Sequence, residues 1–140
     1  MEIRPITEAD IEEVVGLWRT CELARPWNDP YVDIRDAAGK ERSEVFVGTE
    51  GDRLVASAMA GYDGHRGWIY YVSVAPDCQG RGLGKQIMGA AEAFLVECGA
   101  RKIMLMVRES NLGVIEFYHH IGFKKDPTVL LGKFVTEGPY

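Results

Sequence analysis

A run of strand-forming residues that ends in a proline and three glycines constrains the fold more than any other feature of this sequence. Residues 68–74 are mostly β-branched or aromatic, which is typical of a strand. Pro76 ends that strand, and Gly80, Gly82 and Gly84 lead into an amphipathic helix. Such a turn directs several backbone N–H groups and the positive end of a helix dipole toward one point. We therefore expect a phosphate-binding site here.

Two common phosphate-binding motifs do not match this turn. A P-loop needs a glycine where Gln79 stands and a hydroxyl residue where Gln86 stands. A dinucleotide fingerprint needs its third glycine at a position occupied by Lys85 or Ile87. The acidic ribose ligand expected about 20 residues further on is also missing, since residues 100–102 read Ala-Arg-Lys. The spacing therefore excludes both classes of site.

The pattern that fits is Gln-x-x-Gly-x-Gly over residues 79–84. It resembles the pyrophosphate-binding loop of the GNAT superfamily of acyl-CoA-dependent N-acetyltransferases. A second segment carries the same resemblance, because an apolar strand at 102–107 is followed by Asn111 and, seven residues later, by Tyr118. The family has an Asn-x6-Tyr segment in this place. Two such segments in the right order are far more specific than either alone.

The resemblance covers essentially the whole chain and is closest to the small YpeA-like bacterial acetyltransferases. That branch carries the segments found here at Arg25–Pro30 and Gly61–Gly67. The resemblance implies a GNAT fold of the α/β (α+β) class, with a mixed, mostly antiparallel sheet of about six to seven strands flanked by about four helices. It also implies one domain over residues 1–140 and acetyl-CoA as the co-substrate.

The resemblance assigns roles to the residues of both motifs. The turn binds the pyrophosphate, the strand before it binds the pantetheine arm, and Tyr118 faces the departing sulfur. A thiol has a pKa of about 8.5 and a tyrosine about 10, so Tyr118 is expected to donate a hydrogen bond to the developing thiolate. The expected cofactor-binding residues are Val72, Ser73, Val74, Gln79, Gly80, Arg81, Gly82, Leu83, Gly84, Lys85 and Asn111.

The general base is less well defined. Ribosomal-protein alanine acetyltransferases have a glutamate five residues before the asparagine, but here that position is Met106, which accepts no proton. The candidates are Asp63 and His65 in a glycine-rich loop and Glu109 beside the asparagine. A water chain to one of them is as good a hypothesis as direct contact.

Acceptor specificity is expected in two loops. These are Arg25–Pro30, which includes Asn28, and Tyr62–Arg66. Trp27 and Tyr62 could wall an apolar or cation-binding pocket, and Asp29 or Asp63 could attract an ammonium group. The alternative is a purely structural loop with Trp27 in the core. A small amine, an amino acid and a peptide N-terminus all remain open as acceptors.

The periodicity of apolar residues predicts alternating helices and strands. Thr7 is expected to cap a first helix, with Asp10 three residues later, and further helices are expected over about 32–42, from Leu83 to Gly99, and over about 112–121. Strands are expected at 45–49 and 54–62, joined by a turn at 51–52, and at Phe123 and Val129–Val135 as closing strands.

Composition narrows the class of protein. A net charge of −5 argues against nucleic acid as a partner. No run approaches the roughly 18 apolar residues of a membrane span, and the first residues do not resemble a signal peptide. Three cysteines have no metal or redox spacing, so we expect reduced thiols, no metal and a cytoplasmic location. A homodimer is left open.

These observations predict an N-acetyltransferase that moves an acetyl group from acetyl-CoA to a primary amine by direct attack in a ternary complex. The alternative is a non-catalytic acyl-CoA-binding regulatory module. Tyr118 favours the enzyme, and the lack of an obvious base keeps the module open.

Overall fold

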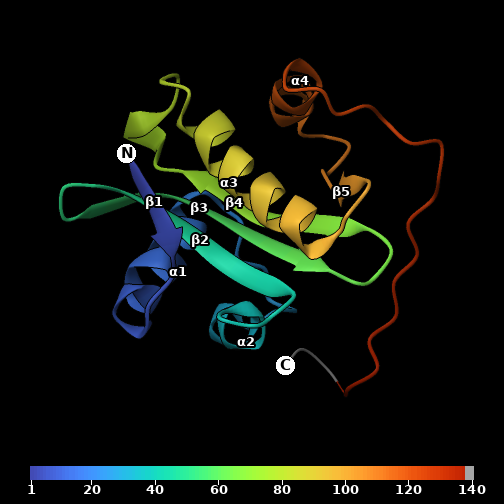
Figure 1. Ribbon diagram of the computed structural model, residues 1–140, viewed down its shortest axis with the longest axis horizontal. Coiled ribbons are helices and arrows are strands. Elements are labelled where there is room, and N and C mark those ends of the chain that lie inside the picture. The colour runs from blue at the N-terminus through green and yellow to red at the C-terminus, as the bar shows by residue number, and fades with distance from the viewer. Residues whose placement is uncertain (138–140) are drawn as a thin grey trace.

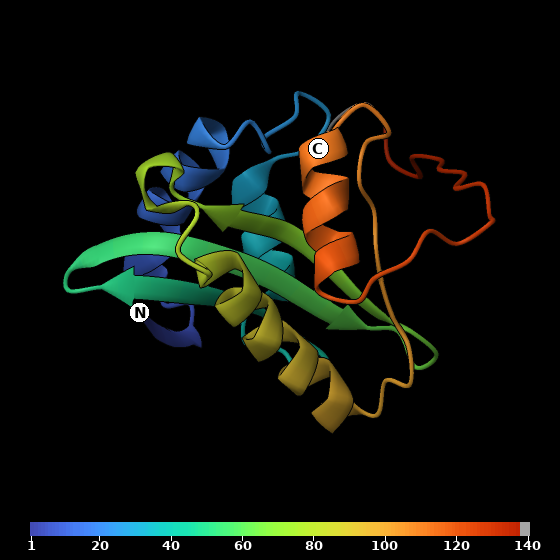
Figure 2. The ribbon, with the colours of Figure 1, turned by 90° about the horizontal axis from the view of Figure 1, so that it is seen from above.

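A single sheet carries helices on both of its faces (Figures 1 and 2). The structure is a computed structural model that describes residues 1–137. Its elements in chain order are β1 (Glu2–Pro5), the 3-10 turn η1 (Glu8–Asp10), α1 (Ile11–Thr20), α2 (Pro30–Ala37), β2 (Ser43–Glu50), β3 (Arg53–Tyr62), β4 (Gly67–Val74), the 3-10 turn η2 (Pro76–Cys78), α3 (Leu83–Cys98), β5 (Ile103–Leu105) and α4 (Leu112–His120).

The strands lie side by side in the order in which they occur in the chain. Neighbours from β1 to β4 are antiparallel, as short turns between them allow. The last pair, β4 and β5, is parallel, because α3 crosses over between them. The mixed, mostly antiparallel sheet with four α-helices confirms the expected class of fold.

The sheet has five strands in the described residues, so the prediction of six to seven was wrong. Phe123 and residues 129–135 were expected to supply the closing strands, and neither is in a strand. This segment runs outside the sheet (Figure 1), and its side chains are exposed, Leu131 by 88% and Val135 by 92%. A β-rich composition gives a strand only where another strand offers hydrogen bonds, and this segment lies beside none.

Alternation along β2 and β3 builds two separate cores. Val45, Val47 and Val55 face α1 and α2 on one side of the sheet. On the other side Ala56, Ala58 and Ala60 face α3 and α4, with Ile87, Met88, Ala91 and Leu95 packed over them. The small alanine side chains allow α3 to lie close to the sheet.

An ion pair fixes the start of α1. Arg4 donates two hydrogen bonds to the Asp10 carboxylate, at 2.7 and 3.0 Å, and Thr7 donates to the same group through its backbone N–H and its hydroxyl. These bonds, the Arg4 bond above all, lower the pKa of Asp10 to about 2. Thr7 and Asp10 thus form a capping box at η1, the turn that leads into α1, and Arg4 of β1 adds to it.

Two features are absent from the part of the chain that the structure describes. Within residues 1–137, no helix is both long and apolar enough to cross a membrane. Over the same part of the chain, His, Cys, Asp and Glu side chains form no group of three suited to a metal ion.

Candidate active site

The parallel strands β4 and β5 separate after a short pairing, and their separation opens the site. Only residues Gly67–Ile69 of β4 pair with β5, although β4 continues to Val74. Beyond Ile69 the two chains diverge. The second half of β4 and residues 105–108 then form opposite walls of one cavity of about 1050 Å³.

A bulge in β4 lies at the point of divergence. Tyr70 pairs with Met59 and Ser73 pairs with Ser57, so Tyr71 and Val72 together oppose a single residue of β3. Tyr71 has φ of 52°, a left-handed conformation that costs a non-glycine residue about 1–2 kcal/mol. Bulges re-aim the backbone next to functional sites. This one turns the strand just before the residues expected to bind the pantetheine arm.

Three contacts hold the bulge in this conformation. The Tyr71 ring stacks on Trp18 of α1, with centroids 3.8 Å apart and planes within 5°. Its phenol donates a 2.6 Å hydrogen bond to Asp33 of α2. Its carbonyl accepts a 2.9 Å hydrogen bond from the Ser57 hydroxyl of β3. The strained residue is therefore fixed from two helices and the neighbouring strand.

Buried hydroxyl groups connect the bulge to the core. Trp18 donates its indole N–H to Ser57 Oγ at 2.8 Å, and the Ser57 and Ser73 hydroxyls lie 2.7 Å apart. Trp18 and Ser57 are fully buried, and Ser73 is 4% exposed. Since Ser57 donates its only proton to the Tyr71 carbonyl, Ser73 must donate to Ser57. Every polar group of this network is then satisfied.

The glycine-rich turn leads directly into α3. Gly80 and Gly82 both have φ of 80°, which favours glycine, and Gly82 is the residue that precedes the helix. No side chain caps α3, so its first N–H groups remain open to a ligand. Gly84 has a different role, because a Cβ there would lie 3.1 Å from the Phe117 ring. It allows α4 to pack against α3.

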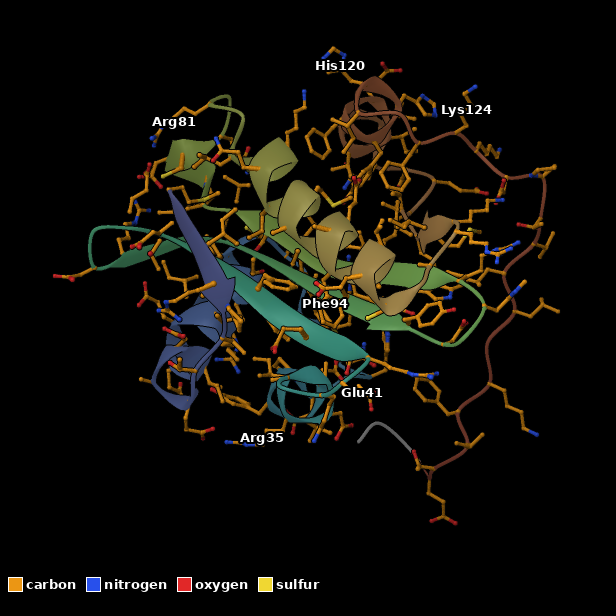
Figure 3. The ribbon with its side chains drawn as sticks, in the orientation of Figure 1. Arg35, Glu41, Arg81, Phe94, His120 and Lys124 are labelled. Atoms are coloured by element: carbon orange, nitrogen blue, oxygen red, sulfur yellow. The ribbon has the colours of Figure 1, made fainter. Side chains whose placement is uncertain are left out.

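The two cations of the turn differ in their surroundings. Arg81 projects from the turn (Figure 3). It donates two hydrogen bonds to Glu50 of β2, at 2.9 and 2.6 Å, and this pairing lowers the pKa of Glu50. Lys85 is exposed and pairs with no acidic side chain in residues 1–137. An anion at this turn would find Lys85 free and would compete with Glu50 for Arg81.

The cavity collects many of the predicted residues from separate elements. The cofactor-binding candidates that line it are Val72, Ser73, Val74, Gln79 and Asn111, and the acceptor candidates are Trp27 and Asn28. Asn111 precedes α4 without capping it, so its amide is available. Gly80, Arg81, Gly82, Gly84 and Lys85 lie at the adjacent turn outside the cavity, and Leu83 is buried in the core.

Tyr118 lies in the cavity wall, on α4. Its ring packs edge-to-face against Phe117 and Phe123, and only 8% of the residue is exposed. Burial raises the pKa of its phenol to about 12. No described residue forms a hydrogen bond with its hydroxyl, which is accessible from the cavity. The phenol is thus held neutral, with its proton available for a bound ligand.

The three base candidates lie outside the cavity. Asp63 accepts hydrogen bonds from the backbone N–H groups of Arg66 and His65, at 2.7 and 2.8 Å, which lowers its pKa. This carboxylate closes the β3–β4 loop, where His65 is exposed. Glu109 is exposed on the loop before α4.

Of the residues expected to bind the acceptor, Trp27 and Asn28 line the cavity, whereas Asp29 and Tyr62 do not. Trp27 is 41% exposed and lies in the cavity wall, so it is not the core residue of the structural alternative. Asp29 caps α2 by accepting from the N–H of Tyr31 at 2.9 Å, and Tyr62 packs in the core on the α3 side. Neither lines the cavity.

Sequence reasoning missed three charged residues of the cavity, Asp33, Asp36 and Arg108, and it included Arg25 only as the first residue of the expected acceptor loop. The two aspartates are three residues apart on α2, which places them on one helix face. That spacing was readable in the sequence. Which way the face points was not, since it depends on how α2 packs.

Comparison with known proteins identifies the family. The model of the Acetyltransferase (GNAT) family matches residues 11–123. An acetyltransferase of Yersinia enterocolitica is 41% identical over 133 residues, covering 95% of this chain and 94% of the relative. An acetyltransferase of Sodalis glossinidius is 42% identical over 138 residues, covering 98% and 97%.

Solved structures share the fold at low sequence identity. A transcriptional regulator from Bacillus halodurans C-125 has a TM-score of 0.80 at 22% identity and covers 95% of this chain and 99% of its own. The aminoglycoside N-acetyltransferase AAC(6')-Iy in complex with CoA has a TM-score of 0.77 at 16% identity and covers 96% and 100%. By its family match and its relatives, the chain belongs to the GNAT family of acetyltransferases.

Proposed function

We propose that this protein transfers an acetyl group from acetyl-CoA to a primary amine, by direct attack of the amine in a ternary complex. The observation that carries the proposal is the placement of the neutral Tyr118 phenol in the same cavity as the bulged strand Val72–Val74. Family membership supports acetyl transfer. Which amine is the acceptor depends on the residues that line the cavity.

The residues present fit CoA. The uncapped start of α3, two glycines at positive φ and the exposed Lys85 suit a pyrophosphate. The gap between β4 and residues 105–108 suits an extended arm, with Asn111 at its side. Acetyl-CoA, when bound, supplies the thioester that the amine attacks.

Tyr118 acts as a hydrogen-bond donor to the leaving sulfur. Its pKa of about 12 exceeds the value of about 8.5 for a thiol by roughly 3.5 units, or about 5 kcal/mol. Full proton transfer to the thiolate is therefore unfavourable. A neutral phenol in a largely buried place still stabilises charge that develops on sulfur.

The bulge at Tyr71 positions the backbone groups for the acyl carbonyl. The strand after it, Val72–Val74, lines the cavity, and its backbone N–H groups there would polarise the thioester carbonyl of bound acetyl-CoA. Preorganised N–H donors of this kind contribute more than most single side chains to acyl transfer. For the proton of the amine we propose a water chain, since Asp63, His65 and Glu109 all lie outside the cavity.

Two measurements test the proposal. An amine panel screened for CoA release detects the transfer, and calorimetry detects CoA binding independently. We expect Gly82→Val to lose CoA affinity, because its side chain would block the approach of the pyrophosphate. Circular dichroism must show that the variant folds, since φ of 80° also strains a valine. Unchanged CoA affinity in a folded variant would refute the assignment of the turn.

The non-catalytic alternative makes a different prediction in the same panel. A regulatory acyl-CoA-binding module would bind CoA at the turn and release none with any amine. The lack of an established base residue is the observation in its favour. CoA release that depends on both an amine and Tyr118 would exclude it.

A further inference from the structure

The cavity carries charges of both signs on different elements. Asp33 and Asp36 lie on α2, Arg25 lies in the loop after α1, and Arg108 lies in the loop after β5. The proposed reaction requires an amine, and acidic groups alone would suit a simple amine. The two arginines would repel it, and so they need an explanation of their own.

Arg25 and Arg108 have no carboxylate partner in the described part of the chain, unlike several arginines elsewhere in the protein. Arg4, Arg53 and Arg81 each pair with an acidic side chain at 2.6–2.7 Å. Across residues 1–137, no acidic group lies within ion-pair distance of Arg25 or Arg108. In a chain with a net charge of −5, this places two unneutralised cations in the cavity wall.

The contact between Arg108 and Trp27 leaves the donors of the guanidinium available. The Arg108 Cζ atom lies 5.6 Å from the centre of the Trp27 ring, which is a cation–π distance. Such stacking uses the face of the guanidinium, whereas its five N–H donors point outward in its plane. That edge matches the two oxygens of a carboxylate.

The phosphates of CoA are not the natural partner of these arginines. The phosphate-binding turn contributes only Gln79 to the cavity, and Gly80–Lys85 lie outside it. The anion that faces Arg25 and Arg108 should therefore belong to the other substrate. The cavity also contains acidic groups on α2, and one of them, Asp33, accepts a 2.6 Å hydrogen bond from the Tyr71 phenol.

We propose that the acceptor is a small zwitterion of the amino-acid class, whose carboxylate binds Arg25 and Arg108. Its amine lies toward Asp33 and Asp36. The inference rests on the proposed function and selects among its acceptors, since a peptide N-terminus or a simple amine has no carboxylate in this position. In the reaction the ammonium first loses one proton to the water chain. The neutral amine nitrogen then forms a bond to the acetyl carbon and the carbon–sulfur bond breaks, and the second proton lost by the nitrogen ends on the sulfur as the thiol of CoA.

Matched pairs of compounds test the proposal. Each amino acid is compared with the amine that it yields on loss of its carboxylate, for example leucine with isoamylamine and lysine with cadaverine. We expect kcat/KM to be roughly 10²-fold higher for the preferred amino acid than for its matched amine. Equal values throughout the panel would overturn the proposal.

Two variants and a control locate the effect. Arg25→Gln and Arg108→Gln should each lower kcat/KM for the amino acid by roughly 10- to 100-fold. Both should leave the affinity for CoA unchanged, and kcat/KM for the matched amine should stay the same or rise, because a positive charge that repels the amine has been removed. Arg101→Gln, which removes an exposed arginine outside the cavity, should change neither. If Arg25→Gln and Arg108→Gln weaken CoA instead, the arginines serve the cofactor and the proposal is wrong.

Direct binding separates this inference from the proposed function. Calorimetry of amino acids with CoA-saturated protein requires no turnover. If amino acids bind in a way that depends on Arg108 but no acetyl transfer follows, the proposed enzymatic activity is refuted and the zwitterion-binding site is supported. The opposite result is transfer to amines with no preference for carboxylate-bearing compounds and no measurable binding of them. It would support the proposed acetyltransferase activity and refute the zwitterion site.

Discussion

Removal of the Ser57 hydroxyl should destabilise the protein far more than its size suggests. Ser57 accepts from the Trp18 indole at 2.8 Å, donates to the Tyr71 carbonyl at 2.9 Å and contacts the Ser73 hydroxyl at 2.7 Å. In Ser57→Ala these groups lose their partner in a place that water does not reach. A buried polar group left unsatisfied costs about 1–3 kcal/mol.

The expected loss in the free energy of unfolding is about 2–4 kcal/mol, because the Ser73 hydroxyl can turn to satisfy one of the groups. For a urea slope of about 2 kcal/mol per M, this moves the midpoint by about 1–2 M. Thr20→Ala is the control, since it removes an exposed hydroxyl that bonds only to the Gly16 carbonyl. It should change stability by less than about 0.5 kcal/mol.

A double-mutant cycle with Trp18→Phe isolates the hydrogen bond from the loss of packing. Trp18→Phe removes the indole donor together with ring volume, and the volume contributes equally in both backgrounds. We expect it to cost about 1–2 kcal/mol less in Ser57→Ala than in the wild type, because the donor there is already unpaired. A coupling energy near zero, or a Ser57→Ala variant as stable as the wild type, would refute the reasoning.

Four further outcomes are expected. Tyr118→Phe should lower turnover by about 10²–10³ without changing CoA affinity, and in steady-state assays the loss should shrink for thioesters of more acidic thiols. Because burial raises the pKa of Tyr118 to about 12, kcat/KM should rise as the amine deprotonates and show no fall near pH 10; a fall that Tyr118→Phe abolishes would contradict this. Glu50→Gln should tighten CoA binding by about two- to fivefold in calorimetry, since it frees Arg81, and weaker binding would argue against a phosphate role for this arginine. Asp10→Asn should lower the urea midpoint at neutral pH; because Arg4 holds the pKa of Asp10 at about 2, the difference should disappear as pH falls from about 4 toward 2, and a constant difference would contradict the assignment.

The turn and Tyr118 were predictable because local sequence determines them. A glycine at φ of 80° before a helix and a tyrosine seven residues after an asparagine are set by positions close together in the chain. The position of Asp63 was also readable in principle. Asp-Gly-His-Arg is a turn sequence whose first carboxylate bonds to the following N–H groups.

The remaining features depend on contacts between distant segments. Residues 129–135 have the composition of a strand, but no strand of the sheet offers them hydrogen bonds. Asp33 lies in the cavity because Tyr71, 38 residues later, bonds to it from the bulge. This bond links the position of α2 to the bulge, so the sequence pattern alone could not predict which acidic residues line the cavity.

The short pairing between β4 and β5 affects which part of the protein unfolds first. Strands β1–β4 follow one another as antiparallel neighbours, whereas β5 is attached to them by three residue pairs. We expect β5 and α4 to open together as one cooperative unit. A ligand that spans the gap between β4 and residues 105–108 would connect this unit to the rest of the molecule. At 100 times its dissociation constant it would add about 2.7 kcal/mol to the unfolding free energy. Amide hydrogen exchange in β5 and α4 should then slow more than in β2 and β3, so that the cofactor acts as a structural link as well as a substrate.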